Sequence, residues 1–133
     1  MNLKLYAAAL AVIAALCICF VCFAGENDAA ADLLRSYGYD VSDKPVEQAE
    51  IRIPKPLDMV YQGYNEIQKR AGFDLEPYEG KKGMRYTYAV KNYPGGIDGV
   101  RANVVVIDGE IVGGDICTVR IDGFMHELKR MAK

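Results

Sequence analysis

The most regular pattern of apolar and polar residues lies over residues 100–121 and predicts extended strands. Every position of residues 104–107 is apolar, as in a strand that is covered on both faces. Asp108 and Gly109 follow directly, and this pair favours a two-residue type I′ turn because both central residues need positive φ. We therefore expect a β-hairpin at the centre of the fold.

The position of the turn predicts which hairpin residues face each other. It sets Val106 opposite Ile111 and Val105 opposite Val112. The glycine pair at residues 113–114 is expected to interrupt the second strand, as a bulge or a bend would.

Three segments have apolar residues at helical spacing. The first covers residues 29–37 and ends at Gly38, and the last covers residues 123–131 after the capping residue Asp122. The clearest covers residues 57–71, and its expected inward residues are Leu57, Val60, Tyr61, Tyr64, Ile67 and Ala71.

Further strands are expected over residues 46–53, 85–91 and 117–121, where apolar and polar residues alternate. Residues 92–99 are too rich in glycine and proline to be regular and form a loop. Helices that alternate with several strands in this order are typical of an α+β fold, with a small antiparallel sheet and helices mainly on one face.

Residues 5–24 carry no charge and have the length of about 20 residues that a helix needs to cross a bilayer. Lys4 precedes this segment, and Glu26 and Asp28 follow it, so the positive-inside rule places the rest of the chain outside the cytoplasm. We expect a single-pass protein of the cell membrane with an extracytoplasmic C-terminal domain. The alternative is a signal peptide cleaved near Ala24, which would leave a secreted domain.

The expected organisation therefore has three parts. Residues 1–24 are the transmembrane anchor or signal peptide, residues 25–45 a helix and connector, and residues 46–133 the small α+β extracytoplasmic domain. The complete fold is expected to be an N-terminal transmembrane helix followed by the antiparallel sheet with helices mainly on one face. The net charge of −2 provides no basic surface for nucleic acid.

No catalytic, cofactor or metal site is predicted. Cys117 falls in an alternating strand pattern that favours a buried, inert thiol, and no motif places His126 beside it as a base. His126 itself is expected on the last helix, at the surface or at a helix end. The cysteines at positions 17, 19 and 22 are embedded in apolar sequence, where cysteine behaves as a small hydrophobe.

Candidate ligand-binding residues lie on the irregular loops, since loops carry function more often than cores do. Tyr78 and Tyr93 are flanked by proline, and Asn92 precedes Tyr93 in the loop of residues 92–99. We therefore name Asn92, Tyr93 and Tyr78 as a candidate ligand surface. The alternative is that the two tyrosine rings attach their loops to the domain.

Several stretches after residue 24 are similar to a known family. The most specific are GFDLEPY, NYP and GGDI, at residues 72–78, 92–94 and 113–116. With residues 33–47, 64–82, 85–95 and 100–126 around them, the chain resembles the bacterial proteins grouped as domain of unknown function 4830. The resemblance implies a short protein that often begins with a membrane segment, and it brings no established activity, cofactor or catalytic residue.

These observations favour a membrane-anchored interaction or sensing module that binds an unknown protein or envelope ligand without catalysis. A structural part of an envelope complex is the first alternative. A small envelope hydrolase is the second, and it would require a cleft that joins Asp or Glu residues to His126 or Cys117.

Overall fold

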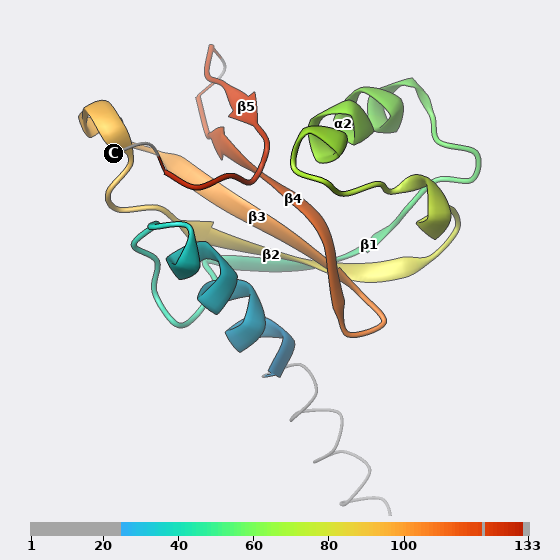
Figure 1. Ribbon diagram of the computed structural model, residues 1–133, viewed down its shortest axis with the longest axis horizontal. Helices are drawn as coiled ribbons and strands as arrows, with labels where there is room; N and C mark the ends of the chain where they lie inside the picture. The colour runs from blue at the N-terminus through green and yellow to red at the C-terminus, as the bar shows by residue number, and fades with distance from the viewer. Residues whose placement is uncertain (1–24, 121, 132–133) are drawn as a thin grey trace, which may run out of the picture.

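The computed structural model describes residues 25–120 and 122–131. Its centre is a five-stranded antiparallel sheet in which each strand pairs with the next one along the chain (Figure 1). The strands are β1 (Glu47–Arg52), β2 (Lys82–Ala89), β3 (Val100–Ile107), β4 (Glu110–Thr118) and β5 (Met125–His126). The other elements are a helix over residues 25–36, α2 (Met59–Arg70) and the 3₁₀ turns η1 (Glu76–Tyr78) and η2 (Pro94–Gly96).

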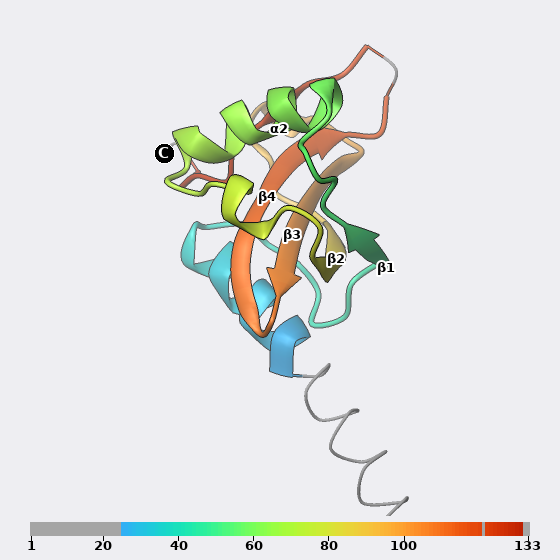
Figure 2. The same cartoon turned by 90° about the vertical axis from the view of Figure 1, so that its right-hand side faces the viewer.

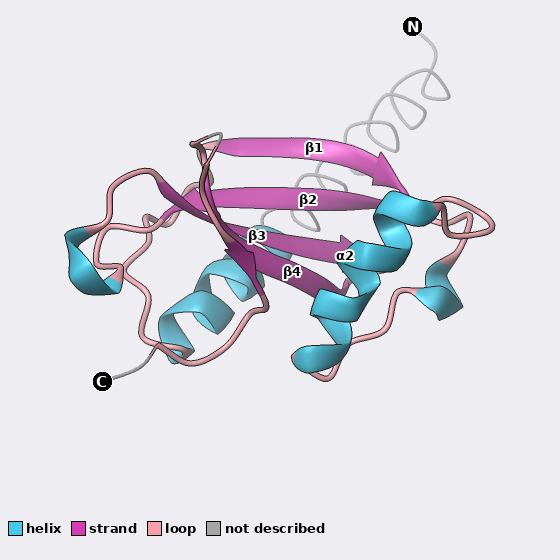
Figure 3. Cartoon of the chain, turned by 90° about the horizontal axis from the view of Figure 1, so that it is seen from above, coloured by secondary structure: helices cyan, strands magenta, loops and turns pink. Residues whose placement is uncertain are grey.

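The central strand β3 is buried on both of its faces, as its apolar run predicts. Val104 and Val106 belong to a first core, and Val105 and Ile107 belong to a second core on the other side of the sheet. Two buried faces need two covers, so the helix of residues 25–36 and α2 lie on opposite faces (Figures 2 and 3). The expectation of helices mainly on one face is therefore wrong, although the α+β class is correct.

The helix of residues 25–36 packs on the first core through Ala30, Ala31 and Leu34, which are buried. Tyr86 and Tyr88 of β2 are buried beneath it. The hydroxyl of Tyr86 donates to the carboxylate of Glu26 at 2.9 Å, and the hydroxyl of Tyr88 donates to the carbonyl of Asn27 at 2.9 Å. Gly38, at φ +97°, follows the helix as expected from the sequence.

Polar side chains attach α2 to the second core. Its fully buried residues are Asn65 and Gln68, whereas Val60, which was expected to face inward, is 77% exposed. The Gly114 amide donates to Gln68 Oε1 at 2.8 Å, and the Leu75 amide donates to Asn65 Oδ1 at 2.7 Å. The side-chain oxygens of these buried amides accept hydrogen bonds from backbone N–H groups. The orientation of α2 therefore depends on directional bonds as well as on apolar contact.

The hairpin between β3 and β4 has the predicted turn, with φ of 52° at Asp108 and 79° at Gly109. Val106 pairs with Ile111 as expected, but Val105 pairs with Gly113 because the register shifts between Val105 and Val106. The irregularity thus comes one residue before the glycine pair, and β4 continues through it.

The glycine pair serves close packing. A Cβ on Gly113 would lie 2.6 Å from Gln68 Oε1, and a Cβ on Gly114 would overlap the carbonyl oxygen of Asn103. Glycine at these positions therefore lets α2 and β3 approach the β4 backbone.

The helix expected over residues 123–131 is also absent. This segment forms β5, which pairs with the end of β4, and then runs extended along the first core. Its backbone groups bond to distant residues: the Met131 amide donates to the Tyr37 carbonyl, and the Lys129 carbonyl accepts from the Tyr39 hydroxyl. These long-range partners replace the bonds that a helix would make within itself.

The transmembrane segment predicted for residues 5–24 lies outside the described residues. Across residues 25–120 and 122–131, each helix is too short or too polar to span a lipid bilayer. The fold that the structure describes is accordingly a five-stranded antiparallel sheet with one helix on each face, in place of the expected anchored sheet with helices mainly on one face.

Two glycines should respond in opposite directions to replacement by alanine. Gly63→Ala in α2 should raise the free energy of unfolding by about 0.5–1 kcal/mol, because glycine weakens a helix interior and the added Cβ would meet nothing within 4 Å. Gly114→Ala should lower it by roughly 1–3 kcal/mol through overpacking. Urea denaturation of both variants tests this, and equal effects would contradict the packing described for Gly114.

Candidate functional site

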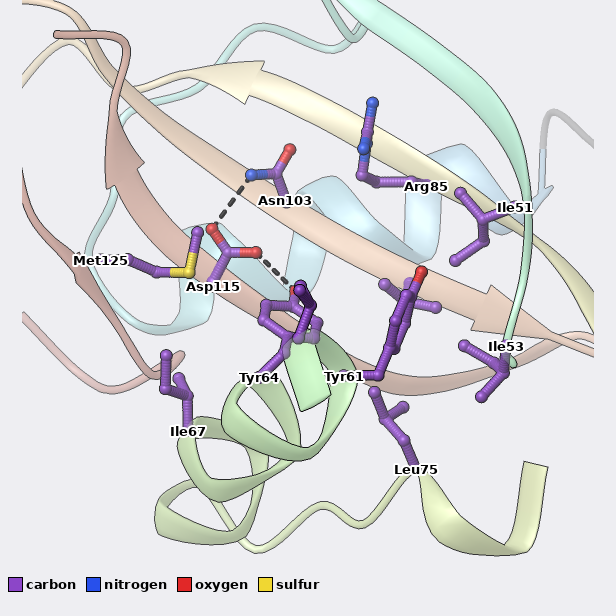
Figure 4. Close-up of a pocket in the computed structure, with 12 residues that line it drawn as sticks. Ile51, Ile53, Tyr61, Tyr64, Ile67, Leu75, Arg85, Asn103, Asp115 and Met125 are labelled. Carbon is purple, nitrogen blue, oxygen red and sulfur yellow. Dashed lines mark hydrogen bonds between the residues drawn. The ribbon is translucent and has the colours of Figure 1, made fainter. Parts of the chain in front are cut away.

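A hollow of about 370 Å³ lies between α2 and the sheet (Figure 4). We call it the α2 groove. One end is bordered by Ile51 and Ile53, and the other by Met125 of β5. The complete lining is Ile51, Ile53, Val60, Tyr61, Tyr64, Ile67, Leu75, Arg85, Asn103, Val105, Asp115 and Met125. Most of these side chains are apolar or aromatic, as in sites that bind small organic molecules.

Asp115 is the central polar residue of the groove, and it is only 2% exposed. Its Oδ1 accepts from the Tyr64 hydroxyl at 2.5 Å, and its Oδ2 accepts from Asn103 Nδ2 at 3.0 Å (Figure 4). Asn103 Oδ1 in turn accepts from Thr87 Oγ1 at 2.6 Å. These bonds form a polar chain that crosses β2, β3 and β4 and ends on α2.

Burial holds the Tyr64 hydroxyl in its neutral form. Desolvation raises the pKa of Tyr64 far above its usual value, and the neighbouring Asp115 carboxylate raises it further. The neutral hydroxyl can therefore donate to Asp115 throughout the physiological pH range. The Tyr61 ring meets the Tyr64 ring edge to face, with centroids 6.2 Å apart, so that the two rings form one aromatic wall.

Arg85 of β2 also lines the groove. Its Nη2 lies 3.1 Å from Glu47 Oε1, which forms an ion pair. A second hollow of about 470 Å³ adjoins the groove and shares Arg85 and Asn103 with it. Arg101 and Thr87 line this second hollow, and it is more polar than the groove.

Cys117 lies half-buried next to Asp115, and its surroundings oppose thiolate formation. Burial raises the pKa of the Cys117 thiol to about 11, with a further contribution from Asp115. A reactive cysteine needs the opposite environment, in which nearby positive charge lowers the pKa. Cys117 is thus half-buried instead of buried as expected from the sequence, while its raised pKa agrees with the expected inertness.

His126 points away from Cys117. In the pairing of β4 with β5, His126 lies opposite Ile116, and Cys117 lies opposite Met125. Because side chains alternate between faces along a strand, those of His126 and Cys117 point to opposite faces of the sheet. His126 Nδ1 lies 2.7 Å from the Glu127 carbonyl, and Nε2 lies 2.7 Å from the Tyr93 hydroxyl. The His126 ring stacks on the Phe124 ring. His126 belongs to β5, and the helix predicted for this segment is not formed.

One family description matches this chain: Domain of unknown function (DUF4830), over residues 33–116. The chain belongs to this family. The match confirms the resemblance that the sequence predicts, but it does not extend to a bacterial source or a membrane anchor. No curated protein and no solved structure matches the chain.

The DUF4830 match contains most of the α2 groove, from Ile51 to Asp115, and excludes Met125. Because the family carries no established activity, the chemistry of the site has to come from its geometry.

The candidate ligand residues on the loops have partners within the domain. Asn92 Oδ1 accepts from the Asp40 amide at 2.8 Å, and Asn92 Nδ2 donates to the Gly38 carbonyl at 3.0 Å. Tyr93 packs beside Phe124, with ring centroids 5.2 Å apart.

Tyr78 lies on η1 and packs against the second core, whereas Tyr93 packs against the first. The structure therefore brings Asn92 and Tyr93 together and leaves Tyr78 on the other side of the sheet. Their role as a ligand surface stays a prediction.

Sequence reasoning missed the Asn103–Asp115 pair because it depends on the register shift. If the register set by the turn continued without an interruption, Asp115 would face Ala102 and point toward the first core; the expected interruption at the glycine pair did not specify a partner for Asp115. The shift instead pairs Asn103 with Asp115. The sequence did contain one signal for this pair: both residues are polar, and they lie inside strands that are otherwise apolar or glycine-rich.

Cys117 should alkylate slowly in the folded chain. Because its pKa is about 11, the rate with iodoacetamide should rise about tenfold per pH unit from pH 7 to pH 9, remaining roughly hundredfold below the rate in urea. Peptide-resolved mass spectrometry separates Cys117 from the three cysteines near the N-terminus. Asp115→Asn should raise the rate, and equal rates in folded and unfolded chains would refute the assignment.

Proposed function

We propose that this DUF4830 domain is a binding module that holds a small organic molecule in the α2 groove. The observation that carries the proposal is an apolar hollow of about 370 Å³ with a buried carboxylate in it. Ligand sites commonly have volumes of about 300–1,000 Å³, apolar walls and a few polar groups that orient the ligand. The α2 groove has each of these properties.

The side chains around the groove favour binding over catalysis. Covalent catalysis needs a nucleophile activated by a base or by positive charge. Burial and the neighbouring Asp115 raise the pKa of the Cys117 thiol, and His126 lies on the opposite face. Tyr64 is likewise held neutral by burial and by Asp115. These groups suit an uncharged hydrogen-bonding surface.

A protein partner is the second candidate, because Met59 and Val60 are 87% and 77% exposed at the start of α2. Exposed apolar neighbours of this kind can mark an interaction surface. Val60 also borders the groove, whereas Met59 does not. This difference provides a matched pair of variants that separates the two candidates.

A neutral apolar probe should enter the groove. In methyl NMR spectra of the full chain, phenylbutanol should shift the signals of Ile51, Ile53 and Val105, and leave those of Val100 and Val104 in the first core unchanged. Val60→Glu should weaken this binding by roughly tenfold, because a carboxylate at the border of the groove must lose water when the probe binds.

Met59→Glu is the control, since it places the same charge one residue away and outside the groove lining. It should leave probe binding unchanged. The absence of methyl shifts at millimolar probe, or equal shifts in both cores, would refute small-molecule binding. Shifts at Val60 and Met59 that depend on protein concentration, without groove shifts from the probe, would instead support the protein interface.

A further inference from the structure

The carboxylate of Asp115 has hydrogen-bond partners but no ion pair. It is almost completely buried, and within residues 25–120 and 122–131 no Lys, Arg or His side chain forms a salt bridge with it. A buried charge without a counter-charge is unfavourable, and buried charges are ordinarily paired. The groove therefore contains one negative group whose charge the domain itself leaves unmatched at close range.

This carboxylate also retains capacity to bind a donor. An ionised carboxylate has about four acceptor positions on its two oxygens. Tyr64 occupies one position on Oδ1, and Asn103 occupies one on Oδ2. The same two bonds hold the carboxylate in place, so that a ligand donor would meet an oriented acceptor.

The walls around Asp115 suit a cation with an apolar body. Tyr61 and Tyr64 present an aromatic wall, and aromatic faces attract cations. Ile53 and Leu75 extend the apolar lining away from the carboxylate, and Val105 also belongs to this lining. One molecule could therefore place its charged end at Asp115 and its apolar part against these side chains (Figure 4).

The positively charged residues near the groove would attract an anionic ligand less than Asp115 would attract a cationic one. Arg85 also lines the groove, where its buried Nε has no hydrogen-bond partner among the described residues, but Glu47 already matches its charge at 3.1 Å. Arg101 lines the second hollow, and its guanidinium donates to the Val100 carbonyl at 3.3 Å. The unmatched charge inside the groove is thus negative.

We propose that the ligand of the α2 groove is an organic amine with an apolar body, whose ammonium group binds Asp115. This inference rests on the proposed function and specifies the ligand class. The ammonium would donate to the free acceptor positions of the carboxylate, and the apolar part would bury the isoleucine, leucine and valine side chains of the groove.

Three probes with the same apolar body test the charge preference. Phenylbutylamine, phenylbutanol and phenylbutyrate are titrated into the full chain at pH 7 by calorimetry, where the amine is protonated. A hydrogen bond to a charged group predicts that the amine binds roughly ten- to hundredfold more tightly than the alcohol. The carboxylate probe should bind more weakly than the alcohol, because Asp115 repels it.

Asp115→Asn should reduce the affinity for the amine to that for the alcohol, because the side-chain shape remains while the charge is lost. Tyr64→Phe removes one hydroxyl donor and keeps the carboxylate, so the preference for the amine should persist. Glu110→Gln is the matched control, since it removes an exposed acid of the same strand, β4, that lies outside the groove lining and outside the Arg85–Glu47 ion pair.

A second measurement does not depend on the folding of any variant. In the complex with the wild-type chain, the methylene next to the amine should show nuclear Overhauser contacts to the Tyr64 ring. Contacts to Ile51 in their place would mean a reversed orientation and would overturn the proposal.

The possible outcomes separate the two levels of inference. Binding of the alcohol with no preference for the amine, or a preference that survives Asp115→Asn, would overturn the amine proposal while small-molecule binding stands. Failure of all three probes to bind at millimolar concentration would overturn both.

Discussion

The double burial of β3 is the constraint on which the rest of the structure depends. A strand with apolar side chains on both faces must have cover on both faces, because exposed apolar area costs about 25 cal/mol per Å². The helix of residues 25–36 covers Val104 and Val106, and α2 with its flanking segments covers Val105 and Ile107. Each strand still pairs with the next one along the chain, although the connection from β1 to β2 contains α2 and η1.

The two covers differ in chemistry. The helix of residues 25–36 packs through small and apolar residues, and the hydroxyls of Tyr86 and Tyr88 donate to its residues Glu26 and Asn27. The second cover, α2, buries Asn65 and Gln68 and binds backbone groups through them. These hydrogen bonds fix the distance between α2 and the sheet, so apolar contact is not needed along the whole length of the helix. The α2 groove is the space that this arrangement leaves beside Tyr61 and Tyr64.

Asp115 is the buried acidic residue of this core. A buried carboxylate loses hydration, and its bonds to Tyr64 and Asn103 offset only part of that loss. An apolar residue at this position would avoid the cost. Departures from local folding rules are expected where a site does something other than stabilise the fold, and Asp115 is such a departure in a groove whose lining is mostly apolar or aromatic.

Local signals in the sequence were sufficient for the elements near the centre of the fold. The apolar run of residues 104–107 indicates double burial, and the Asp108–Gly109 pair indicates the turn, because each depends on residues that are adjacent in the chain. The same holds for the helix that ends before Gly38. The sequence-based prediction failed where the hydrogen-bond partners are distant in the chain. Residues 123–131 have the apolar spacing of a helix, but their backbone groups bond to β4 and to Tyr37.

The sequence by itself thus determined the α+β class, the central hairpin and turn, and membership of the DUF4830 family. Only the tertiary structure decided that the helices lie on opposite faces and that Asp115 meets Asn103 and Tyr64 in a groove. The physical reason is register: side chains alternate between faces along a strand, so the single shift before Gly113 decides which face Asp115 occupies. The glycine pair indicates an interruption of this strand, but the position of the shift, one residue earlier, is set by the pairing of β3 with β4.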